Sequence, residues 1–241
     1  MEFRNSLLAA LAAVDLAALL PALTETSIER GQDLFLPGDL ATHVFFPSTC
    51  VLSVVTHMSS GQNVESSTVG PETASPLLAA LAGQPVKARV FAQIGGGAIR
   101  IPTSVLRARA AENPALMTLL LRHAAAIGFQ AEQGVACNVL HDAPQRLARW
   151  ILMTQDRTGG KSLPLTQDYM AVMTGVQRTT ISVVANQLRA AGLIRYSRGN
   201  LEVIDRAGLE AYACECYRAI REEFDSLRPE LHPAPVTARI Q

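Results

Sequence analysis

The segment from Thr166 to Ile194 constrains the fold more than any other part of this chain. The small residue Ala171 is followed four positions later by Gly175, and Ile181 lies six positions beyond that glycine. The alanine lets two helices cross closely, and the glycine permits a tight turn between them. The shared core is completed by further apolar residues, Met170, Val176 and Val184. The pattern is that of a helix-turn-helix.

The second helix of this motif carries polar side chains on the face turned away from the shared core. Arginine pairs bidentately with guanine and glutamine with adenine, so such a face suits a DNA major groove. Gly192 is expected to cap the helix, and the segment 194–204 predicts a hairpin, or wing, whose arginines can bind phosphates. The predicted DNA-contacting residues are Gln177, Arg178, Thr179, Thr180, Ser182, Arg195 and Arg198. The competing interpretation is a solvated helix face and a solvated hairpin.

The segment from Ser27 to about Pro102 contains short runs of strand-favouring residues that are separated at close intervals by Gly, Pro, Asn and Asp. It predicts a small sandwich or β-roll with a short helix at 77–81. We expect the run Gly95-Gly96-Gly97 to be a turn between strands, and it lacks the lysine of a phosphate-binding loop. The predicted strands are 33–36, 43–46, 51–56, 64–69, 86–94 and 98–101.

A long helix is predicted from residue 113 to 140, where apolar and small residues recur at alternating spacings of four and three. Leu116, Leu120 and Ile127 lie on an adjoining face and can cover the β-roll. Two apolar stripes on one helix favour a homodimer, and burial within a single chain is the alternative. The predicted dimer interface comprises Met117, Leu121, Ala124, Gly128, Ala131 and Val135.

Composition sets wider limits on the chain. Its 241 residues are 49% hydrophobic and 17% charged, which excludes global disorder and a collagen-like chain. The net charge is zero, although the segment 141–206 holds nine basic and five acidic residues. The apolar run 7–14 is interrupted by Asp15 and Pro21, so we expect an amphipathic N-terminal helix and neither a signal peptide nor a membrane span. Four cysteines without a dense spacing favour a reducing, cytoplasmic location.

The cysteines and histidines predict no metal site and no cofactor. Cys214 and Cys216 are two apart on an expected helix, where they would point to different faces and could not chelate one metal together. We expect them to be structural, and their role stays open. The histidines form no close ligand pair in the sequence.

The order of parts, a β-roll, a heptad helix and a winged helix-turn-helix, resembles the Crp/Fnr family of bacterial transcription regulators over about residues 5–228. Motifs typical of one branch are FPST at 46–49, RLARW at 146–150, LPLTQ at 163–167, AGLIRY at 191–196 and CECY at 214–217. The resemblance implies a homodimer whose two recognition helices enter successive major grooves, about 34 Å apart, of double-stranded DNA. It also implies RNA polymerase as a partner, no enzymatic activity and no membrane association.

Two departures from the family pattern affect the expected ligands. The family's recognition-helix arginine matches Arg178, but the acidic residue that commonly follows is Thr179, so the family's operator sequence is not transferred. In cyclic-AMP-responsive members an Arg-Ser pair neutralises the phosphate, whereas Val86 and Lys87 stand there in this chain, and valine supplies no charge. The resemblance therefore implies an effector pocket that includes Glu72, Val86 and Lys87, either for an unidentified small molecule other than cyclic AMP or in a roll that binds no effector.

The predicted fold class is α+β, with a jelly-roll-like β-roll resembling a cyclic-nucleotide-binding domain at 1–112. A dimerisation helix at 113–140, a winged helix-turn-helix at 141–228 and a flexible tail at 229–241 follow. The predicted function is sequence-specific transcription regulation. One alternative is a cupin-like metalloenzyme using His43, His57 and Glu65, and another is an adaptor that has lost DNA binding.

Overall fold

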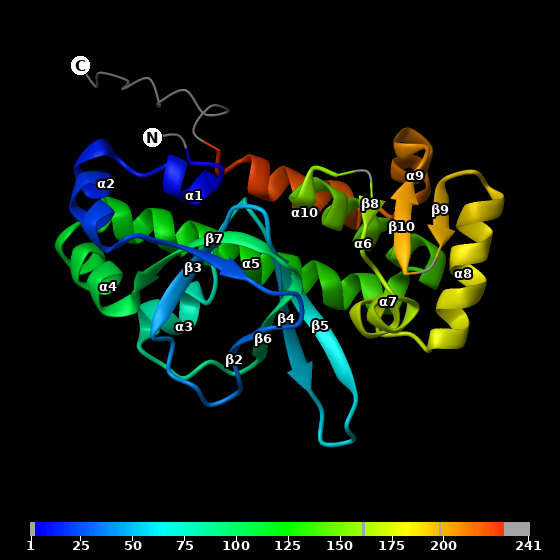
Figure 1. Cartoon of the computed structure of the whole chain (residues 1–241), viewed down its shortest axis with the longest axis horizontal. Helices are drawn as coiled ribbons and strands as arrows, with labels where there is room; N and C mark the ends of the chain where they lie inside the picture. The colour runs from blue at the N-terminus through cyan, green and yellow to red at the C-terminus, as the bar shows by residue number, and fades with distance from the viewer. Residues whose placement is uncertain (1–2, 161, 198, 229–241) are drawn as a thin grey trace, which may run out of the picture.

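The computed structural model describes residues 3–160, 162–197 and 199–228. An N-terminal β-roll and a C-terminal helical unit lie side by side, and the long helix α5 (Pro114–Leu140) runs along the roll and on into the C-terminal unit (Figure 1). This arrangement confirms the predicted α+β class and the order of its three parts. The expected flexible tail lies outside the described residues.

The β-roll consists of two antiparallel sheets, with strand orders β1-β7-β3 and β2-β6-β4-β5. Apolar side chains of both sheets fill the space between them, among them Val44, Leu52 and Ile101, all fully buried. The ends of the predicted strands agree to within three residues, and β1 was not predicted. The elements are β1 (Thr24–Ile28), β2 (Asp33–Phe35), β3 (His43–Pro47), β4 (Val51–His57), β5 (Asn63–Val69), α3 (Leu77–Ala82), β6 (Arg89–Ile94) and β7 (Gly96–Pro102).

The turn predicted at Gly95-Gly96-Gly97 is shorter in the structure, where Gly95 alone separates β6 from β7. Strand β7 already begins at Gly96. A Cβ atom on Gly95 would lie 2.8 Å from the backbone nitrogen of Arg30, and one on Gly96 would lie 2.8 Å from that of Cys50. The glycines therefore allow neighbouring backbone segments to approach each other closely.

The N-terminus forms two short helices, α1 (Ser6–Ala9) and α2 (Ala13–Leu19), followed by the 3-10 helix η1 (Leu20–Ala22). The prediction of one amphipathic helix was wrong, because the helix is interrupted between Ala9 and Ala13. Asn5 anchors the start of α1 to the roll. Its buried Nδ2 donates to the carbonyl oxygens of Pro47 and Thr73 at 3.0 and 2.8 Å. Within the described residues, no helix has the length and apolar character needed to cross a bilayer.

Helix α5 follows α4 (Thr103–Glu112) and begins at Pro114. The N-cap of α5 is Asn113. The Asn113 side chain accepts hydrogen bonds from the amides of Ala115 and Leu116 at 3.0 and 3.4 Å. Leu116 and Leu120 are buried against the β-roll, as their spacing predicted. The helix thereby covers the roll with one face along its first half.

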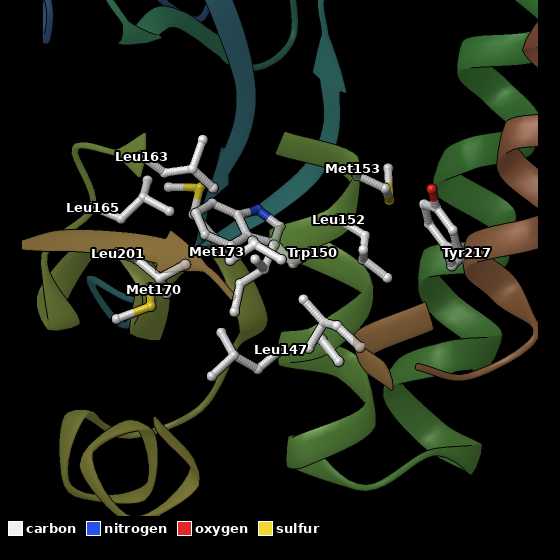
Figure 2. Close-up of a cluster of buried hydrophobic side chains, with 14 of the residues drawn as sticks. Leu147, Trp150, Leu152, Met153, Leu163, Leu165, Met170, Met173, Leu201 and Tyr217 are labelled. Carbon is white, nitrogen blue, oxygen red and sulfur yellow. The ribbon is translucent and has the colours of Figure 1, made fainter. Parts of the chain in front are cut away.

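The C-terminal unit is built around Trp150 on α6 (Ala143–Thr158), with apolar side chains from several helices and strands converging on it (Figure 2). Its small sheet has the order β8-β10-β9. The remaining elements are β8 (Ser162–Leu163), α7 (Gln167–Thr174), α8 (Arg178–Ala190), β9 (Ile194–Ser197), β10 (Asn200–Val203), α9 (Arg206–Tyr212) and α10 (Cys216–Asp225).

Arg157 of α6 joins the C-terminal unit to both other parts of the chain. Its Nε donates to Glu72 of the roll at 2.8 Å, and one Nη donates to Gln130 of α5 at 2.9 Å. The side chains of Arg157 and Glu72 are only 6% and 12% exposed. A Cβ on Gly70 would lie 2.5 Å from Arg157 Cγ, so a glycine is needed beside this contact.

A second buried contact lies between the roll and α6. The Glu65 carboxylate accepts hydrogen bonds from the hydroxyl of Ser53 and from the indole nitrogen of Trp150, the latter at 2.9 Å. The residue as a whole is half-buried, but its carboxylate is enclosed. Burial raises the pKa of this carboxyl from its usual 4.5 to about 7, although both hydrogen bonds and the charges of Arg157 and Arg149 oppose the rise.

Replacing Arg157 with methionine leaves Glu72 as an uncompensated buried charge, so Arg157→Met is expected to lower the free energy of unfolding by about 3–5 kcal/mol. The double variant Arg157→Met/Glu72→Gln should lose clearly less, because the orphaned charge is gone. Urea unfolding measures the free energy of unfolding of both variants, and Glu72→Gln is the control. Equal losses in the single and double variants would contradict a charge-based role.

Glu65 should make stability depend on pH in the acid to neutral range. Its raised pKa means that the folded state keeps a proton that the unfolded state loses. The retained proton on Glu65 therefore stabilises the folded state fully below about pH 4.5, and this stabilisation is lost as the pH rises to about 7. It amounts to about 3 kcal/mol of the free energy of unfolding at most. The melting temperature of wild type minus that of Glu65→Gln, measured across this range, should fall with pH. A difference that is flat or rises would refute the assignment.

Candidate nucleic-acid interface

Helices α7 and α8 form the helix-turn-helix predicted from the sequence. The Thr166 hydroxyl caps α7 by accepting from the amide of Tyr169 at 3.3 Å. Gly175 ends α7 at φ +65°, a conformation in which a side chain is strained. Ile181 is fully buried and Ala171 is 9% exposed, so both fill the contact between the helices.

The residues expected to contact DNA on α8 fall into two groups. Gln177, Arg178 and Thr179 surround the start of the helix and are exposed, whereas Thr180 and Ser182 are half-buried. The Ser182 hydroxyl lies 2.9 Å from Gln167 Oε1 of α7, to which it donates. Ser182 therefore fastens α8 to α7, and the outward surface is carried mainly by the first three residues.

Val183 adds an apolar member to the outward surface that the sequence prediction did not include. Its side chain is 58% exposed on α8, where nothing in the described part of the chain covers it. An exposed aliphatic side chain on a recognition helix suits contact with a thymine methyl group. The sequence could have indicated this exposure, because Val183 directly follows Ser182 and therefore lies at the edge of the polar helix face.

The electrostatics at the start of α8 favour an anion. The first turn contains no acidic residue, and the partial positive charge of a helix N-terminus adds to that of Arg178. Arg178 Nη1 lies 3.2 Å from Asp168 Oδ1, with both side chains about two-thirds exposed at 66% and 67%. An exposed pair of this kind contributes about 1 kcal/mol or less, so the guanidinium can exchange partners readily.

The hairpin β9-β10 forms the predicted wing beside α8 (Figure 1). Arg195 on β9 is 69% exposed and donates across the hairpin to Glu202 at 2.8 Å. Gly199 turns the hairpin at φ +78°, and Asn200 Nδ2 donates to the Ser162 hydroxyl at 2.6 Å. The predicted contact residue Arg198 lies outside the described residues.

A cavity of about 590 Å³ lies between the β-roll and α5, within the size range of small-molecule sites. Val86 and Lys87 line it, as expected for the effector pocket. Glu72 does not, because it is paired with Arg157 at the contact with α6. The lining is mostly apolar, and Lys87 is its sole basic residue among the described side chains.

The heptad face of α5 is divided between this cavity and the surface. Ala124, Gly128 and Ala131 line the cavity from α5. Leu121 and Val135 are 47% and 68% exposed. Met117 is half-buried, and the apolar surface extends to the end of the helix through Val139 and Leu140, which are 78% and 75% exposed.

The prediction that Cys214 and Cys216 point apart on one helix was wrong. Helix α10 begins at Cys216, and Cys214 precedes it, so helical spacing does not separate the two sulfurs. Their sulfurs instead lie beside Cys137 and His141 at the end of α5. The signal that was missed is the spacing of four between Cys137 and His141, which places both on one helix face.

The fold and the exposed second helix define a winged helix-turn-helix protein attached to a β-roll. Residues 145–212 match the Crp-like helix-turn-helix domain. Among curated proteins, none matches the sequence. The chain therefore contains a Crp-like helix-turn-helix domain.

Solved structures extend the likeness to the whole architecture. FixK2 from Bradyrhizobium japonicum is 17% identical, with a TM-score of 0.69 over 80% of this chain and 98% of that one. A CRP-family transcriptional regulator from Thermus thermophilus is 20% identical, with a TM-score of 0.66 over 78% and 96%. The c-di-GMP-responsive global regulator CLP from Xanthomonas campestris is 12% identical, with a TM-score of 0.66 over 80% and 100%. The chain has the fold of Crp/Fnr transcription regulators, which confirms the resemblance inferred from its sequence.

Proposed function

We propose that this protein is a sequence-specific DNA-binding transcription regulator that acts as a homodimer. The observation that carries the proposal is the exposed start of α8, where Gln177, Arg178 and Thr179 project from a helix held rigidly by a buried core. Side chains of this kind read base edges in a major groove. Arg195 on the neighbouring wing is exposed and suits a phosphate contact.

The dimer is proposed from the surface of α5. Leu121, Val135 and Val139 are large apolar side chains that nothing covers among the described residues. Gly128 is exposed between them, so a second helix backbone can approach closely there. A two-fold pair along this face would present two copies of α8 to one duplex.

An effector is proposed from the cavity beneath α5. Lining by Val86, Leu77 and Ile127 favours an apolar molecule, and Lys87 accommodates one anionic group. A cyclic nucleotide is disfavoured because its phosphate needs a bidentate charged partner, which valine does not provide. Because Gly128 and Ala131 belong to both the cavity and the heptad face, an occupant would bear directly on the proposed dimer helix.

The alternative of a cupin-like metalloenzyme has no support in the roll. His43 contacts Thr42, His57 contacts Asn63, and the Glu65 carboxylate is bonded to Ser53 and Trp150. The three candidate ligands are therefore held by separate partners in the described part of the chain.

Arginine variants test the proposed DNA contacts. After the preferred site has been selected from random duplexes, Arg178→Ala should cost about 1–3 kcal/mol on that site and much less on random DNA. Arg195→Ala should weaken both alike and reduce the dependence on salt. Fluorescence anisotropy measures each affinity, with Arg218→Ala as control because Arg218 is 72% exposed on the remote helix α10. Equal losses on both DNAs for Arg178→Ala would contradict base reading.

A charge placed on the α5 surface tests the dimer. Leu121→Glu and Val135→Glu should each shift the protein to monomers, because a buried interface would hold two unpaired carboxylates. Sedimentation velocity measures the assembly state, and Val14→Glu is the control, since Val14 is 63% exposed on α2 away from this face. A monomeric wild type, or dimers that survive both changes, would count against the proposal.

A further inference from the structure

Four side chains from two distant parts of the sequence meet where α5 ends. Cys137 lies in the last turn of α5 and His141 caps it, while Cys214 and Cys216 lie just before and at the start of α10. Their potential ligand atoms all lie within 4.8 Å of one another. The three cysteines are buried and His141 is half-buried, so the group is closed to most solvent.

Two of the six separations among the four ligand atoms are close to an edge of a tetrahedron around one metal ion, and the others are at most 4.8 Å. Cys137 Sγ and Cys214 Sγ are 3.5 Å apart, and Cys216 Sγ is 3.7 Å from His141 Nδ1. A zinc ion with bonds of about 2.3 Å to sulfur and about 2.0 Å to nitrogen places two sulfurs about 3.8 Å apart and a sulfur and a nitrogen about 3.5 Å apart. In a four-iron cluster each cysteine binds a different iron, so the sulfurs stand farther apart than they do here.

The surroundings of His141 prepare its ring for a metal. Its Nε2 lies 3.1 Å from the Glu215 carboxylate, which fixes the proton on Nε2. The other ring nitrogen, Nδ1, then carries the lone pair, and it is the atom that faces Cys216 Sγ. A carboxylate that orients a ligating histidine from behind is a recurrent feature of zinc sites.

A buried cation is available to balance the charge of such a site. Three thiolates around one divalent ion leave one net negative charge, which is costly to bury alone. Arg149 on α6 is 9% exposed, and its Nε has no hydrogen-bond partner among the described residues. Its charge acts on all three sulfurs of the group.

We propose that Cys137, His141, Cys214 and Cys216 bind a single Zn²⁺ ion in a closed Cys₃His site. The ion joins the end of α5 to the start of α10, across the point where the chain passes from α5 into α6. It therefore stiffens the connection between the long helix and the C-terminal unit. The site stands on these four residues alone and does not depend on the proposed DNA binding.

Metal loading of the full-length protein tests the site. Reduced, metal-free protein titrated with Co²⁺ should take up one ion per chain and develop thiolate-to-cobalt charge transfer together with the visible bands of tetrahedral cobalt. Zn²⁺ should then displace the cobalt and abolish both signals. Inductively coupled plasma mass spectrometry should find one zinc ion per chain in protein that was purified without a chelator.

Matched variants separate this site from adventitious binding. Cys214→Ser and Cys216→Ser should each lower the charge-transfer intensity by at least the share of one thiolate, whereas Cys50→Ser, which alters a buried cysteine of the roll, should leave it unchanged. His141→Ala should retain charge transfer but change the visible bands, because one ligand alone is replaced. Circular dichroism verifies that each variant is folded. If a cysteine variant does not fold, the spectrum of His141→Ala tests the site instead.

Several results would overturn the proposal. One is a reduced wild-type protein that binds neither Co²⁺ nor Zn²⁺ stoichiometrically, which would leave the cysteines as packed thiols. Another is a cobalt spectrum unchanged by both Cys214→Ser and His141→Ala. Iron accompanied by acid-labile sulfide in the purified protein would replace the single ion with a cluster.

Discussion

The buried guanidinium of Arg157 is the contact on which the arrangement of the three parts depends. A charge with so little exposure is tolerated only where paired and hydrogen-bonded, and its partners come from the roll, from α5 and from the backbone of α6 itself. All of them must be in place together. The absence of a side chain on Gly70 lets Arg157 reach the roll closely enough to make these bonds.

Three features of the molecule converge on α5. One side of the helix covers the roll and closes the apolar cavity, another carries the exposed heptad surface, and its end holds the cysteine and histidine group. A rigid helix of 27 residues carries a displacement at one end to the other with little loss. Ligand, partner chain and metal would therefore all act on the same element before reaching α8.

Local patterns in the sequence predicted local structure well, because period and turn chemistry act within a few residues. The crossing of α7 and α8, the extent of α5 and most strands were predicted from such patterns. Contacts between distant residues were not: Glu72 pairs with Arg157 across 85 positions, and Cys137 meets Cys214 across 77. A single sequence carries no local signal for such pairs, so Glu72 was placed in the cavity and the cysteines were treated as unrelated.

The ion pair between Arg178 and Asp168 has a consequence for how the surface selects among duplexes. In the proposed regulator, Asp168 is a tethered anion that competes with DNA for the Arg178 guanidinium. Exchanging that carboxylate for a backbone phosphate replaces one anion with another and gains little. A guanine base offers two acceptors to the same guanidinium. Competition from Asp168 would therefore weaken non-specific phosphate contacts of Arg178 more than its contact with a guanine.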